Sequence, residues 1–295
     1  MAKHFTPKQV AQAIGVSESS LKRWCDKGLL RIDKTAGGHR RLSLESIVQF
    51  VRATGQQLRR PELIGLTAGE GGRFATHDTT GDLLDSLVRG DEPALRHIVL
   101  GLYLKGESLV DLCDRRLAPA FAKIGHGWEA GQVAVYQERR AVEICQRLLF
   151  ELSTLILEPP QGAPVAIGGT LSGDPYQLAT SMVELALREA GWQAQSFGVG
   201  LPSDTVVAAI DTLRPRLCWL SISTIESRES FAAAFVPISQ AAARCGTALV
   251  VGGRALIEPV RRDLTFAAYG DNLRHLLGFA QSLVAAPAPM AVAPH

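Results

Sequence analysis

The spacing of apolar residues changes along this chain of 295 residues, and the changes divide it into three folded parts. Between residues 83 and 158, apolar side chains recur every three or four positions, which is the period of an amphipathic helix. They include Leu84, Leu87, Val88, Leu95, Ile98, Val99, Leu102, Val142, Ile144, Leu148, Leu149 and Leu152. This pattern predicts several helices packed as a four-helix-bundle-like domain over residues 83–158.

After Pro159 and Pro160 the pattern becomes one of short, continuous apolar runs. The runs lie at residues 165–169, 194–199, 217–223 and 248–253, and helical patterns at 177–190, 203–213 and 228–244 separate them. Strands that alternate with helices are typical of a doubly wound α/β domain with a parallel sheet. We therefore predict a Rossmann-like domain over residues 159–280, with its ligand crevice beyond the carboxyl ends of the strands.

The first 60 residues carry the pattern of a helix-turn-helix. Thr6-Pro7 opens one helical pattern, and Ser17 stands where its hydroxyl can cap a second helix that contains Leu21 and Trp24. Gly15 lies between them, where the chain must turn. The second helix is the predicted recognition helix, because its polar residues fall on the side opposite to Leu21 and Trp24.

A glycine turn with basic residues follows at 35–42 and predicts a wing, so we interpret residues 1–60 as a winged helix-turn-helix. The predicted DNA-contacting residues are Ser17, Ser19, Ser20, Lys22, Arg23, Lys34, His39, Arg40 and Arg41. Charge supports this interpretation, since residues 1–60 hold 12 Lys and Arg against 4 Asp and Glu. The remaining residues hold 19 against 25, so the basic charge is confined to one end, as expected of a DNA-binding protein.

The Gly28-Leu29-Leu30 step and the run from Gly37 to Arg41 resemble the winged helix-turn-helix of MerR-family transcriptional regulators over residues 4 to about 60. The resemblance implies binding to double-stranded operator DNA. Because a single winged head makes few base contacts, we expect paired sites and a homo-oligomer, either a dimer or a tetramer.

The remaining segments are simpler. Residues 61–82 are polar and rich in glycine, which predicts a linker, and residues 281–295 predict a disordered tail.

The first residues lack the apolar core of a signal peptide and no long apolar run follows, so we expect a cytoplasmic protein that does not enter a membrane. The five cysteines are scattered without metal-ligand spacing, and no catalytic constellation can be identified, so we expect no enzyme.

The bundle and the sheet together resemble a cobalamin-binding module. The resemblance lies in the motif from Gly173 to Ala179, in Ser221-Ile222-Ser223 and in Gly252-Gly253, each after a predicted strand. With the MerR-like head, residues 4–280 resemble the light-responsive cobalamin repressors of the CarH type. In that family the corrin lies between bundle and sheet, its nucleotide tail descends into the sheet, and the histidine of an Asp-x-His-x-x-Gly motif ligates cobalt.

This chain departs from the family pattern where the chemistry lies. Tyr176 stands in place of the cobalt-ligating His, and Ala179 in place of the Gly that makes room for the tail. A phenol must lose a proton before it binds a metal strongly, so standard His-ligated cobalamin is not expected. In the bundle, Trp128 and Glu138 fit the Trp-x(9)-Glu-His signature of the upper corrin face, but Arg139 replaces its His. The permanent charge of Arg139 suits a carboxylate better than an adenosyl group.

The candidate cofactor-binding residues follow from this resemblance. They are Trp128, Glu138, Arg139, Asp174, Tyr176, Ser221, Ser223, Gly252 and Gly253. His126, close to Trp128, is a further candidate as an axial ligand to haem or cobalt, and cobalamin, haem or a bilin would be the tetrapyrrole. Three functions remain open: a ligand-switched repressor, a ligand-independent regulator whose module serves oligomerisation or partner binding, and a corrinoid carrier protein of a methyltransferase.

Overall fold

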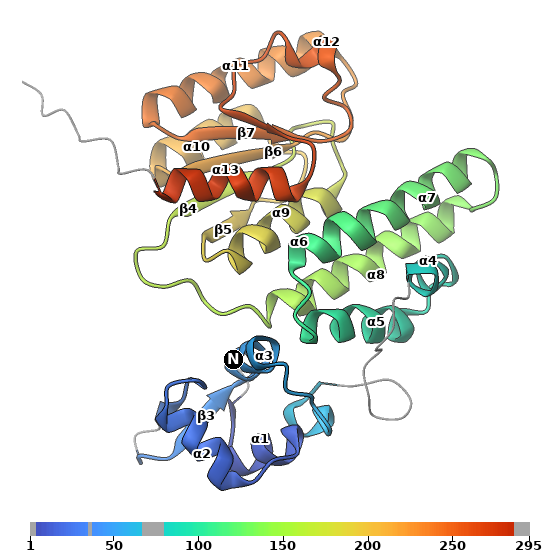
Figure 1. The fold of residues 1–295 in the computed structure, drawn as a ribbon. Coiled ribbons are helices and arrows are strands. Elements are labelled where there is room, and N and C mark those ends of the chain that lie inside the picture. The colour runs from blue at the N-terminus through green and yellow to red at the C-terminus, as the bar shows by residue number, and fades with distance from the viewer. Residues whose placement is uncertain (1–3, 35–36, 67–79, 286–295) are drawn as a thin grey trace, which may run out of the picture. The chain divides into compact units, whose positions relative to one another are not determined.

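The computed structural model describes residues 4–34, 37–66 and 80–285. The chain forms two compact units, Met1–Leu157 and Glu158–His295 (Figure 1). The first unit contains the helix-turn-helix head and the helical bundle, and the second contains the parallel sheet. This arrangement confirms the predicted fold class in all three parts.

The head is a winged helix-turn-helix. Its elements are β1 (His4–Phe5), α1 (Pro7–Ile14), α2 (Glu18–Asp26), β2 (Asp33–Lys34), β3 (Arg40–Ser43) and α3 (Leu44–Thr54). The three strands form an antiparallel sheet in the order β1-β3-β2. A capping box starts α1, since the backbone N–H of Gln9 donates to Thr6 Oγ1 and that of Thr6 donates to Gln9 Oε1. Gly15 ends α1 in the left-handed conformation that the turn requires.

Residues 61–66, which we predicted as the start of the linker, pack on the head. A short 3₁₀ helix, η1 (Pro61–Ile64), follows the pairing of the Arg59 and Arg60 amides with the Ala13 carbonyl. Ile64 and Leu66 are buried, and these two apolar side chains fix the segment. Residues 67–79 of the predicted linker lie outside the described residues, and helix α4 already begins at Thr80.

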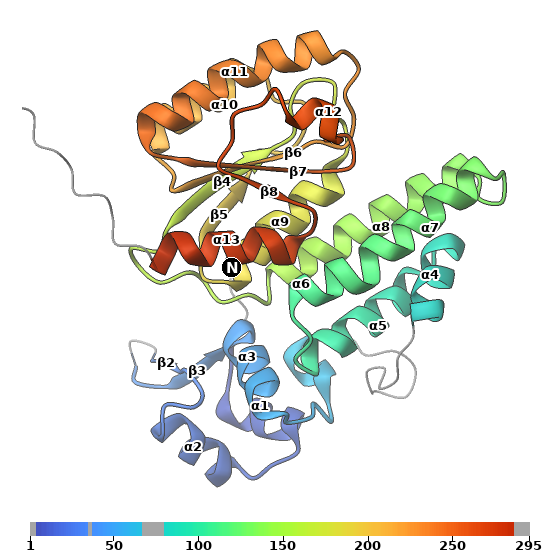
Figure 2. The same ribbon diagram turned by 45° about the horizontal axis from the view of Figure 1, so that its top comes forward.

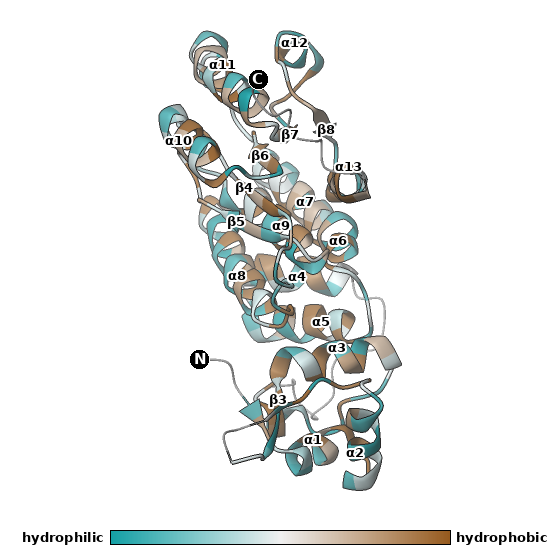
Figure 3. Cartoon of the chain, turned by 90° about the vertical axis from the view of Figure 1, so that its left-hand side faces the viewer, coloured by the Kyte–Doolittle hydropathy of each residue, from teal (hydrophilic) through white to brown (hydrophobic). Residues whose placement is uncertain are grey.

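The bundle consists of α4 (Thr80–Arg89), α5 (Glu92–Leu104), the consecutive helical segments α6 (Leu109–Leu112), η2 (Cys113–Leu117) and α7 (Ala118–Glu129), and α8 (Val135–Ser153). The turn η2 is π-helical and joins α6 to α7 without a break, so the described residues form four helical rods. Two ion pairs tie α5 to α8: Arg96 with Glu151, and Arg147 with Glu92 at 2.8 Å. In Figure 3 hydrophobic and hydrophilic residues share α8, as an amphipathic helix requires.

The second unit is a five-stranded parallel sheet in the order β5-β4-β6-β7-β8. Its strands are β4 (Val165–Gly169), β5 (Gln193–Ser196), β6 (Leu217–Ser221), β7 (Ala248–Gly252) and β8 (Ala268–Gly270). Its helices are α9 (Gln177–Glu189), α10 (Ser203–Leu213), α11 (Arg228–Cys245), α12 (Glu258–Arg261) and α13 (Leu273–Ala285). Figure 2 shows α10 and α11 on one face of the sheet and α9 and α13 on the other.

The two faces of this sheet have different cores. Cys218 and Leu220 of β6 pack with residues of α10 and α11, such as Ile210 and Ile238, in one hydrophobic cluster. The side chain of Trp219, between them, points to the opposite face and bonds to α9. Helix α13 extends to Ala285, so residues 281–285 of the predicted tail are helical, whereas residues 286–295 lie outside the described residues.

The cluster beneath α11 predicts a stability difference between two residues of that helix. Replacing the buried Ile238 with Ala should destabilise the sheet unit by about 2–5 kcal/mol, because it leaves a cavity in the core. Replacing Val236, which is exposed on the same helix, with Ala should change the free energy of unfolding by no more than about 0.5 kcal/mol. Guanidinium unfolding of both variants measures this, and equal losses would contradict the assigned core.

Candidate functional site

The exposed side of α2 carries the residues that we predicted to contact DNA. The hydroxyl of Ser17 caps the helix by accepting from the Ser20 amide at 3.1 Å, and it also lies 3.0 Å from the Ser20 hydroxyl. Ser19, Lys22 and Arg23 are exposed. The opposite side holds the helix in place: Leu21 is fully buried, and Trp24 contacts Phe50 of α3 with ring centroids 4.9 Å apart. The helix thus presents two cations and several hydroxyls to solvent on a fixed support.

The wing joins β2 to β3, with Lys34 opposite Arg40 and Asp33 opposite Arg41. His39 is exposed, and Arg41 is half-buried. Arg40 has a local partner, since its Nη1 lies 2.9 Å from Oδ1 of Asp26 at the end of α2, and 36% of its side chain remains exposed. This ion pair links the wing to the recognition helix. Sequence reasoning missed Asp26, because no local pattern relates it to the wing.

A second group of predicted residues lies on the hairpin of α7 and α8. Trp128, in the last turn of α7, is 52% exposed, and His126 on the same helix is also exposed. Glu138 lies in the first turn of α8 and pairs with the adjacent Arg139 at 3.5 Å. The two arms of the hairpin therefore carry the Trp-x(9)-Glu residues, and the indole is open to a ligand.

The third group gathers where the parallel strands end. Asp174, only 4% exposed, follows β4, and its Oδ2 accepts from the backbone amides of Ser223, at 2.5 Å, and Thr224, at 3.3 Å. Its Oδ1 accepts from the amide of Tyr176 at 3.1 Å. A buried carboxylate needs such donors, and here three amides from two loops supply them. Asp174 therefore joins the loops after β4 and β6.

Tyr176 is covered by a residue that the sequence analysis did not include. The guanidinium of Arg254, after β7, lies 4.7 Å from the centroid of the Tyr176 ring. Arg254 Nε also donates to the Ser223 carbonyl at 3.1 Å. Tyr176 remains 37% exposed, and its ring is thus engaged by a cation at the position where the family has the cobalt ligand. The signal in the sequence was the single basic residue directly after Gly252-Gly253.

The two glycines after β7 have a structural reason for being glycine. A Cβ at Gly252 would meet the Gly270 carbonyl, and one at Gly253, where φ is +122°, would overlap the Ile222 backbone. Ser221 is buried at the end of β6, opposite Gly252. The structure therefore brings Asp174, the Ser223 backbone and the glycine loop together at one end of the sheet, whereas the ligand-binding role of these residues stays a prediction.

Just inside this end of the sheet, Trp219 fills the face covered by α9. Its indole N–H donates to Thr180 Oγ1 at 2.9 Å, and the side chain is 1% exposed. Gly168 of β4 is its neighbour across the strands, and a Cβ at Gly168 would overlap the indole ring.

The position of the family's cobalt-ligating histidine offers no imidazole to a corrinoid, because it is occupied by Tyr176. The phenol ring of Tyr176 stacks with Arg254, and the indole of Trp219 fills the sheet face beside Gly168. In the ranges 4–34, 37–66 and 80–285 no group of three His, Cys, Asp or Glu residues could hold a metal ion. Among the same residues, no helix is both long and apolar enough to cross a membrane.

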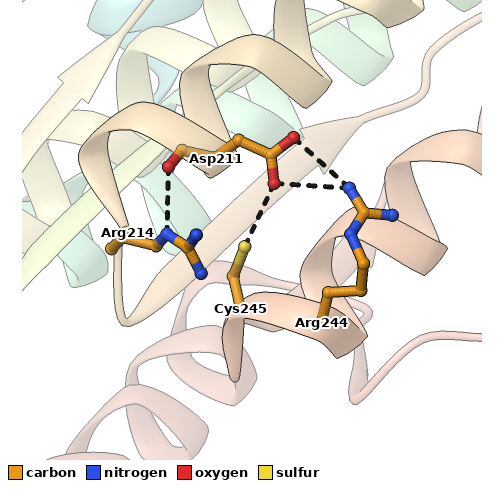
Figure 4. Close-up of polar contacts among 4 residues, drawn as sticks. All are labelled: Asp211, Arg214, Arg244 and Cys245. Carbon is orange, nitrogen blue, oxygen red and sulfur yellow. Dashed lines mark hydrogen bonds and ion pairs between the residues drawn. The ribbon is translucent and has the colours of Figure 1, made fainter.

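Polar residues also cluster at the ends of α10 and α11 (Figure 4). Asp211 accepts from the Cys245 thiol at 3.3 Å and pairs with Arg244 at 3.3 Å. Partial desolvation and the hydrogen bond to Asp211 raise the pKa of the Cys245 thiol above its usual value. Because the thiolate is the reactive form, this environment disfavours a nucleophilic or redox role, and the cluster serves to join two helices.

This environment predicts the reactivity of Cys245, the cysteine that is not buried. Asp211→Ala removes a charge that opposes thiolate formation, so alkylation by iodoacetamide at pH 8 should accelerate. Arg244→Ala removes a cation that favours the thiolate and should slow the reaction. Peptide-resolved mass spectrometry measures both rates, and a slower reaction in the Asp211 variant would contradict the assigned cause.

Comparisons with known proteins found family matches to two separate parts of the chain. A helix-turn-helix domain family matches residues 5–55, and the B12 binding domain family matches residues 81–152. The chain is 25% identical over 265 residues to the HTH-type transcriptional repressor CarH of Myxococcus xanthus. This alignment covers 83% of the present chain and 87% of that repressor.

A solved structure resembles about two thirds of the chain in its fold. The monomethylamine corrinoid protein of Methanosarcina barkeri aligns with a TM-score of 0.57 and 17% identity, over 68% of this chain and 96% of that protein. At this identity the match shows the fold alone. The chain therefore joins a helix-turn-helix domain to a B12-binding-type domain, with the architecture of the CarH-type repressors.

Proposed function

We propose that this protein is a transcriptional regulator, acting as a repressor, that binds double-stranded operator DNA through α2 and the β2–β3 wing. The observation that carries the proposal is the exposed cationic side of α2, fixed on a buried core next to a basic wing. Lys22 and Arg23 can reach base edges or phosphates from a recognition helix, whose N-terminal residues lie deepest in the major groove. The similarity to the CarH repressor over most of both chains supports this role.

We assign two roles to Arg40, an ion pair within the free protein and a phosphate contact in the DNA complex. In the protein alone its guanidinium pairs with Asp26 and holds the wing against α2. An exposed ion pair of this kind contributes little to stability, so a phosphate can replace the carboxylate at small cost. Arg40 would then contribute sequence-independent affinity, and His39 and Arg41 would contact the same backbone or the adjacent minor groove.

The operator should contain paired half-sites. One recognition helix reads only a few base pairs, and a regulator of this size needs further contacts to distinguish its site from competing DNA. We therefore propose that the protein binds DNA as a homo-oligomer, a dimer or a tetramer, at half-sites spaced by whole helical turns.

The B12-binding-type module would be the sensory part, with altered or lost cobalamin ligation. The exposed Trp128, with Glu138 on the other arm of the hairpin, supports a planar tetrapyrrole ligand at the bundle. Tyr176 beneath Arg254 argues against an axial protein ligand from the sheet. The same stack favours the second candidate function, in which the module has no ligand and serves oligomerisation or partner binding.

Replacing Arg40 with Ala tests the DNA-binding proposal. The variant should bind specific and non-specific duplexes more weakly, and the slope of log K against log salt should fall by about 1, because one phosphate contact is lost. Fluorescence anisotropy across a salt series measures the slope. Arg262→Ala, at an exposed arginine of the sheet unit, is the matched control and should leave the slope unchanged. An unchanged slope in the Arg40 variant would remove the wing from the interface.

Absorption spectra after incubation with adenosylcobalamin, haem or a bilin and subsequent desalting test the sensory proposal. We expect one chromophore to be retained by the protein and lost in Trp128→Ala. Tyr136→Ala, at an exposed aromatic on the same hairpin, should retain it. No retained chromophore together with intact DNA binding would favour the ligand-independent regulator, and gel filtration in dark and light would then show one unchanging oligomer.

A further inference from the structure

The indole of Trp219 lies inside the sheet unit, on the sheet face covered by α9. Trp219 is next to Gly168 on the adjacent strand β4, and the ring takes the volume that the glycine leaves open. Both residues are buried, and both lie on the face of the sheet covered by α9. The space beside Gly168 is therefore filled by a large aromatic side chain.

A hydrogen-bond chain holds the indole in this position. The N–H of Trp219 donates to Thr180 Oγ1, which lies 3.1 Å from Ser196 Oγ on β5, and the Gly198 amide donates to that same Ser196 oxygen at 3.2 Å. Each of the side-chain groups in this hydrogen-bonded series thus has a partner inside the protein. Moving the indole aside would break a buried hydrogen bond and open a cavity, both of which destabilise the fold.

The size and shape of the indole are also informative. Indole and benzimidazole are both planar, fused six- and five-membered rings, and the nucleotide base of cobalamin is a dimethylated benzimidazole. Ala179, where the family has the glycine that makes room for the tail, directly precedes Thr180 on α9. The residue that replaces the family's glycine and the residue that anchors the indole are thus adjacent in α9.

We propose that Trp219 takes the place of the nucleotide base, so that the sheet unit is closed to tail insertion. A corrinoid that binds this protein would keep its benzimidazole coordinated to its own cobalt, or would lack the nucleotide altogether. The proposal rests on the corrinoid part of the proposed function and does not depend on the DNA-binding part.

Replacing Trp219 with Ala in the full chain should open a cavity that accepts free 5,6-dimethylbenzimidazole. At a ligand concentration about tenfold above the dissociation constant, the melting temperature of the variant should rise by about 3 °C, and that of the unmodified protein should not. Trp192→Ala is the matched control, because Trp192 is an equally buried tryptophan of the same unit. No rise in a folded Trp219 variant, or an equal rise in the Trp192 variant, would overturn the proposal.

A second measurement needs no substitution and stands even if the Trp219 variant does not fold. The unmodified protein is incubated with cob(II)alamin whose benzimidazole is labelled with 15N, desalted and examined by electron paramagnetic resonance. A coordinated 15N benzimidazole splits the cobalt lines into doublets, whereas an imidazole from the protein would split them into triplets. We expect either no retained cobalamin or retained cobalamin with the doublet splitting. Retained cobalamin without it would show a displaced base and overturn the proposal.

Operator binding measured on the same preparation separates the two claims. Loss of DNA binding would contradict the proposed function and leave the closed sheet unit intact, whereas a displaced base with intact DNA binding would contradict only the role of Trp219.

Discussion

The carboxylate of Asp174 makes the contacts on which the end of the parallel sheet depends. A buried negative charge is tolerated only with strong donors, and three backbone amides, those of Tyr176, Ser223 and Thr224, provide them. These bonds fix the loop after β4 against the loop after β6. Because Asp174 stabilises the loops without any ligand, its presence in the Asp-x-His-like motif is explained by structure alone. What distinguishes this chain is therefore what surrounds Asp174.

Two aromatic residues of the sheet unit, Tyr176 and Trp219, are held in place by their neighbours. Arg254 covers the ring of Tyr176 on the outside, and Trp219 fills the sheet face beneath α9. In the head, by contrast, the cationic side of α2 is exposed to solvent, while its other side is buried and well packed. The proposed site for DNA is thus open, whereas the sheet face beneath α9 is filled by an aromatic side chain. The proposed regulator, with an exposed DNA-binding surface and altered cobalamin ligation, accounts for both observations.

The sequence predicted the fold closely wherever long periodic or apolar runs occur, as at α9–α11 and β6–β7. It missed β8, which is three half-buried residues long, and it placed Ile64 and Leu66 in a linker because only tertiary packing reveals their burial. The orientation of Trp219 was also out of reach, since a strand buried on both faces shows no alternation. Contacts such as Arg254 on Tyr176 join loops of different strands, and no local pattern encodes them.

Operator reading by α2 can be tested by letting the protein select binding sites from a pool of random DNA duplexes. We predict enrichment of one sequence as two half-sites, with their centres separated by whole helical turns of DNA. Recovery of a single unpaired half-site would contradict the proposed oligomeric binding. Recovery of no sequence above the non-specific background would contradict the proposal that α2 reads an operator.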